Sequence, residues 1–494
     1  MNPKYHKKSE VPPLYERGAR GDFPCGSIRQ IPLSPPFAKG DLIAIFLIAA
    51  TLLLTGCSGL LPRSQYARPD VSLPQQWQAS TVTGSSVAMK EQWWRDFNDP
   101  TLSGLIERAL TTNNNLAAAT IRVKRAQLSS RLTNTNLTPN VSVNATSSLN
   151  RDLNSRRDTK SSGVTATASY ELDLWGKLAS ARDAGTWEAE ATEYDRRSTA
   201  LSLVGTVASN YWTIAYLNDR IVSVEASISN AGRIRELVEV KYQAGAVSAL
   251  DKVQAQQSVA SQKAQLTQFQ QQRTESRNAL AILFDLAPEN KLPELQSLPS
   301  GSLPNVAAGL PANILAQRPD LQAAELRLKK YLASIDNTRA SYYPSFTLTG
   351  SLGTSSTSLI EVIKNPYAAL GAGLALPFIQ WNSMKLNIEI SKTDYEEAVI
   401  NFRQTLYSAL SDVENTLSAR TNYAEEVKQT EESLTLARKA EELAEIRYRS
   451  GATALQSWLD AQESRRDAER TFAVVRLAQL KNSMTLYQAL GGAM

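Results

Sequence analysis

The sequence predicts an α+β membrane protein whose chain is an internal duplication of about 205 residues. Three observations predict this class: repeated features at one period, strands with one apolar face, and helical stretches of coiled-coil length. Gly245 recurs as Gly451 and Trp175 recurs as Trp381, each 206 residues later, and their neighbours recur with them. Matched features in the same order at one spacing indicate two similar halves.

Each half is expected to begin with a helix. Asp99 is a typical N-cap residue, and Pro100 suits the first helical position. The second half repeats this start at Arg318, Pro319 and Asp320. Apolar residues then recur at helical spacing in both places, which predicts helices that bury one face.

Two strands are expected after each of these helices. Residues 164–174 alternate strictly between apolar and polar side chains, and residues 141–146 do so over a shorter run. In the second half residues 345–352 alternate, and a fourth strand around residues 370–378 has Gly and Ala on its other face. The Asn-, Ser- and Arg-rich residues 147–162 are expected to form the loop between the first two strands.

Very long helices are expected after the strands. Stretches of about 65 residues without proline make helices of roughly 100 Å, which are stable only when neighbours share their apolar faces. The turns between outgoing and returning helices are expected at Gly245 and Gly451. The four helical stretches are residues 176–242, 252–283, 382–447 and 454–489.

The missing residue types exclude most enzyme classes. His6 is the only histidine, and Cys25 and Cys57 are the only cysteines. A mature chain beginning at Cys57 has no histidine, which rules out Ser-His-Asp and Cys-His catalysis, His/Cys zinc sites and His-ligated haem. Enzymes that use only carboxylates are not excluded in this way, but most enzyme classes are, and we expect no catalytic residue, no metal site and no enzyme activity. The net charge is +5 for the whole chain and +2 without residues 1–56, which gives no electrostatic footprint for nucleic acid.

The N-terminal segment is expected to be a targeting signal. Residues 42–54 are a 13-residue run that is apolar except for Thr51. As a helix it spans about 20 Å and falls short of the roughly 30 Å membrane core. This length favours a signal peptide over a membrane span or a buried helix. Residues 54–57 resemble the lipobox of bacterial lipoproteins, in which the thiol of Cys57 receives a diacylglycerol. Ser58 is not the aspartate that retains enteric lipoproteins at the inner membrane, so the outer membrane is implied.

The strands fit a transmembrane barrel with lipid outside and water inside, although half-buried strands of a soluble core fit the alternation equally well. The expected lipoprotein signal favours the transmembrane barrel over the soluble core. Four strands cannot close a barrel, a dimer's eight enclose only side chains, and a trimer's twelve leave a passage. Barrel geometry therefore favours a trimer if the protein is a conduit.

Short motifs then point to a family. They are Trp93, Trp94, Phe97, Asp99 and Pro100; Asn114 and Leu116; residues 170–177; Tyr242 and Gly245; residues 318–320; Tyr448 and Gly451; and residues 460–462. In this order, and duplicated, they cover essentially the whole chain after Cys57. The chain resembles the TolC-like outer-membrane efflux proteins, and particularly their lipoprotein branch (NodT/OprM-like), which serves pumps of the resistance-nodulation-division (RND) type.

The resemblance implies a homotrimer with a twelve-stranded outer-membrane β-barrel, four strands per chain, continued by a long periplasmic α-helical coiled-coil barrel. It implies the exit duct of a tripartite efflux pump, which passively conducts solutes from an inner-membrane RND-type transporter and a periplasmic adaptor (membrane fusion) protein. The duct would lie among outer-membrane lipid, anchored by the lipid on Cys57, and extend into the periplasm. The resemblance implies no cofactor besides that lipid.

The domain boundaries follow from the repeat and the resemblance. The expected parts are 1–56, an extension with a lipoprotein signal peptide; 57–98, the lipid anchor and an equatorial segment; 99–286, the first repeat; 287–311, an equatorial linker; 312–490, the second repeat; and 491–494, a tail.

Two groups of site residues are carried over from the family. The adaptor-docking turns would be Gly245, Ala246 and Val247, and Gly451, Ala452 and Thr453. The alternative is that both glycines merely permit a tight turn.

The periplasmic gate would use Asp251, Tyr448 and Asp460, the tyrosine latching the closed state and a ring of three Asp460 carboxylates attracting cations. Solvated helical carboxylates are the alternative. Where some family members place a basic latch partner, this chain has Thr453, which puts a salt-bridged lock in doubt.

Two other functions stay open at this point. The exit duct of a type I protein secretion system would share the tunnel, although the lipobox argues against it. A periplasmic coiled-coil scaffold lipoprotein without a pore would share the helices, and the period-two strands disfavour it. An enzyme ranks third because the mature chain has no histidine.

Overall fold

A computed structural model describes residues 63–79, 91–288, 290–304, 306, 309, 311–358 and 364–492. The chain divides into two units, Met1–Cys57 and Ser58–Met494. Every described residue belongs to the second unit. The expected signal peptide and the lipidation site at Cys57 lie outside the described residues.

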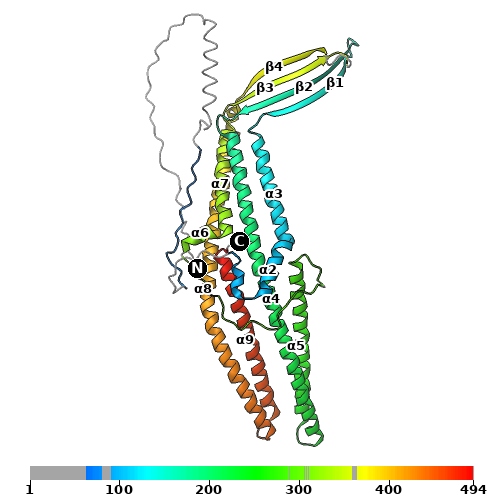
Figure 1. Ribbon diagram of the computed structural model, residues 1–494, viewed down its shortest axis with the longest axis vertical. Helices are drawn as coiled ribbons and strands as arrows, with labels where there is room; N and C mark the ends of the chain where they lie inside the picture. Colours follow the sequence, from blue (N-terminus) through cyan, green and yellow to red (C-terminus); the bar gives the residue numbers. More distant parts are fainter. Residues whose placement is uncertain are drawn as a thin grey trace, which may run out of the picture. The chain divides into compact units, whose positions relative to one another are not determined.

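The elements of the second unit follow the expected order of helix, two strands and two long helices, twice over (Figure 1). They are η1 (Trp93–Phe97), α2 (Pro100–Thr112), α3 (Asn114–Thr135), β1 (Asn140–Arg151), β2 (Asp158–Leu172), α4 (Lys177–Gln243), α5 (Ala249–Ile282), η2 (Pro311–Asn313), α6 (Ile314–Gln317), α7 (Pro319–Ala340), β3 (Ser345–Ser356), β4 (Pro366–Ala375), η4 (Pro377–Ile379), α8 (Trp381–Arg449) and α9 (Leu455–Ala489).

The starts of the two halves differ in their caps. Asp99 caps α2 as expected, its carboxylate accepting a hydrogen bond of 2.9 Å from the amide of Leu102. Pro319 occupies the first turn of α7, but the side chain of Arg318 does not cap that helix. Arg318 instead binds the carboxylate of Asp320 at 2.7 Å.

The strands form one antiparallel sheet in the order β1-β2-β3-β4. The prediction of a loop over residues 147–162 is wrong: β1 and β2 pair through to Arg151 and Asp158, so the turn is far shorter. Ser147 and Ser162 lie opposite each other, with 3.0 Å between their hydroxyl oxygens, so the ladder holds polar residues that favour loops in isolation.

The fourth strand also differs from its predicted bounds of 370–378. β4 begins at Pro366 and ends at Ala375, because Pro377 opens the short helical turn η4. Pro366 occupies the first position of an edge strand, where its missing N–H is tolerated.

The long helices are as extended as predicted. α4 has 67 residues and α8 has 69, which gives each a length of roughly 100 Å. In their upper parts the helices pack in the order α3, α4, α7, α8, which repeats the order of the strands they adjoin. In their lower parts α4 packs with α5, and α8 packs with α9. Among the described helices, none combines the length and apolarity required to cross a membrane.

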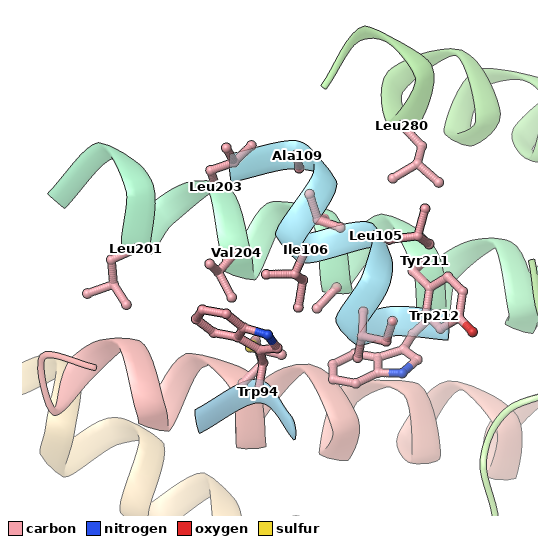
Figure 2. Close-up of a cluster of buried hydrophobic side chains, with 14 of the residues drawn as sticks. Trp94, Leu105, Ile106, Ala109, Leu201, Leu203, Val204, Tyr211, Trp212 and Leu280 are labelled. Carbon is pink, nitrogen blue, oxygen red and sulfur yellow. The ribbon is translucent and has the colours of Figure 1, made fainter. Parts of the chain in front are cut away.

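The largest apolar core lies where α2, α4 and α9 meet (Figure 2). Trp93 is 1% exposed, and its ring stacks on Tyr487 with 4.6 Å between centroids. Trp94 is buried beside it, and Tyr211 donates a hydrogen bond of 3.1 Å to the Asp99 carboxylate. Large buried aromatic rings of this kind each stabilise the fold by about 1.5–3 kcal/mol, so this core fixes the middle of the long helices.

An extended segment, residues 63–79, lies along the helices and is called the strap below. A row of carboxylates holds it. The hydroxyl and amide of Ser64 donate to Asp336 at 2.7 and 2.8 Å, and Arg68 binds Glu325 at 2.8 Å. The amide of Ala79 donates to Glu414 at 2.7 Å. The strap therefore connects α7 with α8 through side chains far apart in the sequence.

Candidate channel entrance and adaptor-docking site

The two hairpin turns have the same backbone geometry. Gly245 has a φ of 74° and Gly451 has a φ of 77°, both in the left-handed region that glycine adopts without strain. The amide of Ala246 donates to the carbonyl of Lys241 at 2.9 Å, and the amide of Ala452 donates to that of Arg447 at 2.9 Å. These are Schellman ends of α4 and α8, so the duplication extends to single hydrogen bonds.

The expected docking residues differ in exposure. Gly245, Ala246, Gly451 and Ala452 are exposed at the ends of the hairpins. Val247 is half-buried and packs against the apolar cluster described next, and Thr453 is half-buried with its hydroxyl oxygen inaccessible. Four of these six residues are thus exposed to a partner, and the other two, Val247 and Thr453, pack beneath the turns.

Below the turns, a small apolar cluster joins both hairpins, and it is called the tip cluster here. All four long helices contribute to it. Its buried members are Ile234, Val238, Ala255, Tyr448, Leu455 and Trp458. The cluster therefore ties the α4–α5 hairpin to the α8–α9 hairpin within one chain.

Tyr448 lies inside this cluster. It is 4% exposed, and its ring lies 5.4 Å from that of Trp458, centroid to centroid. The Nζ of Lys241 lies 4.3 Å from the centroid of the Tyr448 ring, a cation–π contact between α4 and α8. The hydroxyl of Tyr448 is buried and has no hydrogen-bond partner among the described residues. The ring, rather than the hydroxyl, makes the contacts between the hairpins.

The two expected gate carboxylates lie on different hairpins and have local partners. Asp251 forms a capping box at the start of α5, accepting bonds of 2.9 Å from the amide and 2.6 Å from the hydroxyl of Ser248. These hydrogen bonds lower the pKa of the Asp251 carboxyl. Asp460 is exposed on α9 and accepts a bond of 2.5 Å from Gln456. Both carboxylates therefore offer negative charge near the hairpin ends.

Lys241 was not among the residues singled out from the sequence. Its signal lies in the repeat: Lys241 and Arg447 occupy equivalent positions, so each half has a cation directly before Tyr242 or Tyr448. Only the packing of the hairpins distinguishes them, because Lys241 contacts the ring of Tyr448 and Arg447 is exposed.

The arrangement defines a class of protein. An open four-stranded sheet at one end of a duplicated pair of helical hairpins is the arrangement expected of one subunit of a multichain barrel, because four strands cannot close a barrel alone.

Comparison with known proteins gives the family. The model of the outer membrane efflux protein family matches residues 105–284 and 310–492, so the chain belongs to this family. The Pseudomonas putida pyoverdine export outer membrane protein OpmQ is 32% identical over 458 residues, which cover 90% of this chain and 96% of that protein. The probable outer membrane lipoprotein SilC of Salmonella typhimurium is 27% identical, with 90% and 97% covered.

Solved structures agree. The open-state Neisseria gonorrhoeae MtrE outer membrane channel has a TM-score of 0.74 and 30% identity, with 88% of this chain and 98% of that chain covered. The outer-membrane channel OprN has a TM-score of 0.81 at 24% identity, with 87% and 99% covered, and shows the shared fold.

The predicted family and fold class are therefore confirmed. The protein is a trimeric outer-membrane channel of the TolC-like type and the exit duct of a tripartite efflux pump. It works with a periplasmic adaptor and an inner-membrane transporter, and its body extends from the outer membrane through the periplasm.

Proposed function

We propose that the channel conducts solutes passively, performs no covalent chemistry and uses no cofactor besides a lipid. The names of its relatives support this. OpmQ is named for pyoverdine export, and relatives 29% and 30% identical are named for toxin and drug export and for toluene efflux. These compounds have few chemical features in common that a duct could recognise. We therefore expect the inner-membrane transporter, rather than the duct, to select the substrate.

The tip turns are proposed to dock the adaptor. The observation that carries this is the pair of matched Schellman ends, which present Gly245 with Ala246 and Gly451 with Ala452 on exposed backbone of equal shape. Two similar turns per chain give six in a trimer, a repeated surface suited to a repeated partner.

A photo-cross-linking residue at Ala452 tests the docking proposal in cells. The expected product is a covalent adduct with the adaptor, identified by mass spectrometry. The matched control is the same residue at Val222, which is 61% exposed on α4 well away from the turns. Equal adducts at both positions, or none at Ala452 in an active pump, would refute the docking role.

The resting gate is proposed to lie at the tip cluster. Its lock is Lys241 stacked on Tyr448, in place of a basic partner at position 453, where the residue is Thr453. Asp251 and Asp460 add carboxylates near the same end, and in a trimer each occurs three times around the axis. Such a ring attracts cations and repels anions.

Cys57 is proposed to carry the lipid anchor. The strap supports this, because Ser64 is held by Asp336, four residues before the end of α7, next to the strands. Arg63 follows Cys57 by six positions, a reach of about 20 Å when extended. Mass spectrometry of the purified N-terminal peptide is expected to find a diacylglyceryl cysteine, and an unmodified thiol would refute the anchor.

A further inference from the structure

Two helices lie at the edges of the helical layer, directly below the two edges of the sheet. α3 leads into β1, α8 follows β4, and Figure 1 shows the two helices on opposite sides of α4 and α7. A trimeric barrel closes only where β1 of one copy pairs with β4 of the next. Continuity of chain then brings α3 of one copy beside α8 of the next.

α3 has an exposed row of side chains opposite its packed face. Leu116, Ala119 and Val123 are buried on the side that packs on α4. The exposed row follows the 4-3-4 spacing of a coiled-coil seam, and its members are Ile121, Arg125, Leu128 and Leu132. The three apolar members are 53–70% exposed, so this face is unusually apolar for one that meets only water.

α8 has a matching row in its upper half. Ser391, Phe402 and Leu406 are buried on one side of the helix. The opposite row alternates in steps of four and three, and its members are Leu386, Ile390, Thr393, Glu397, Ile400, Gln404 and Tyr407. The apolar members Leu386, Ile390, Ile400 and Tyr407 are 49–65% exposed.

One charge in each row sets how the rows align. α3 runs toward the sheet and α8 runs away from it, so the two helices are antiparallel across the boundary. Arg125 and Glu397 are the charged members, and neither forms an ion pair within the described part of the chain. If Arg125 and Glu397 are paired, Leu132 lies beside Ile390. Leu132 is seven residues nearer the sheet than Arg125, and Ile390 is seven residues nearer the sheet than Glu397.

The surrounding charges are complementary. α3 has four basic residues, Arg122, Lys124, Arg125 and Arg131, and no acidic one. Residues 386–400 of α8 contain the opposite excess, with one Lys392 against Glu389, Asp394, Glu396 and Glu397. Opposed potentials of this kind favour one partner and one register.

We propose that the α3 row of one copy and the α8 row of the next form the subunit seam of the helical barrel, with Arg125 paired to Glu397. The occupant of each face is a second copy of this chain. The proposal rests on the trimeric channel described above and names the side chains that close it.

Disulfide cross-linking of the full-length protein in its membrane tests the alignment. A variant with both Leu132→Cys and Ile390→Cys is expected to give covalent trimer on oxidation, at least tenfold above either single variant. Leu132 and Ile390 lie on helices at opposite edges of one chain, so the expected disulfide forms only between copies. Either single variant measures the background linking that Cys25 or Cys57 causes. The control pairs Leu132→Cys with Leu436→Cys, which is 63% exposed much farther along α8.

Charge exchange tests the pair without new bonds. Arg125→Glu and Glu397→Arg are each expected to lower the yield of heat-resistant trimer at least tenfold, and the two together to restore it within twofold. Arg438→Glu, at an exposed arginine of α8 well outside residues 386–407, is the control and is expected to stay within twofold of wild type.

The outcomes separate the seam from the channel itself. Native trimer without linking of the cysteine pair, equal linking of the control pair, or no restoration by the charge exchange would overturn the seam and leave the duct. Absence of any trimer in the wild type would overturn both.

Discussion

At the scale of single residues, Lys241 is the side chain whose loss most directly tests the tip lock. Lys241→Gln removes a cation–π contact with Tyr448 that is typically worth about 0.5–2 kcal/mol. We expect longer resting openings in single-channel recordings. Arg447→Gln, the exposed equivalent in the other half, is expected to behave like wild type. Equal open times for both variants and wild type would remove Lys241 from the gate.

The tip glycines carry a second residue-scale prediction. A methyl group at Gly451 meets nothing within 4 Å, so Gly451→Ala acts through its φ of 77° alone, a cost of roughly 1–2 kcal/mol. We expect faster amide hydrogen exchange around the second turn. Gly232→Ala, in helical backbone of α4 with equally open space, is expected to slow local exchange. Changes of the same sign at both sites would contradict the account.

At the scale of elements, three tyrosine–carboxylate bonds fasten the strap and the two long helices. Tyr66 donates to Glu325, Tyr211 to Asp99 and Tyr487 to Asp96. Burial, and then the adjacent carboxylate, raises the pKa of each phenol above its usual value of 10.0.

These shifts predict alkaline destabilisation. Above about pH 10 the unfolded chain releases phenolic protons that the folded chain keeps, so the free energy of unfolding falls as pH rises. Denaturant titrations between pH 8 and 11.5 are expected to show this slope. The triple variant Tyr66→Phe, Tyr211→Phe and Tyr487→Phe is expected to flatten it, and an unchanged slope would argue against the three bonds.

The elements also show which features could be predicted from the sequence and which could not. The duplication, the caps at Asp99 and the two glycine turns are local signals, and they were predicted. The extension of β1 and β2 through serines depends on pairing between strands, and the contact of Lys241 with Tyr448 depends on two hairpins meeting. Neither is encoded within one stretch of chain, since tertiary pairing overrides local preference.

At the scale of the whole molecule, assembly creates the function. The described part of one chain supplies four strands and four long helices, and the passage exists only when three chains close around an axis. The exposed rows on α3 and α8 are then interior surfaces of the assembly. The tip cluster holds the two hairpins together within each chain, and the proposed gate opens when they separate.

Single-channel conductance of the purified full-length protein in planar bilayers tests this account most directly. The wild type is expected to give small, cation-selective openings, because the proposed gate places carboxylates around the channel entrance. The variant with both Asp251→Ala and Asp460→Ala is expected to give larger and less selective openings, since those charges are gone. No conductance from either protein, with trimers confirmed in the bilayer, would contradict the claim that this chain forms a conducting duct.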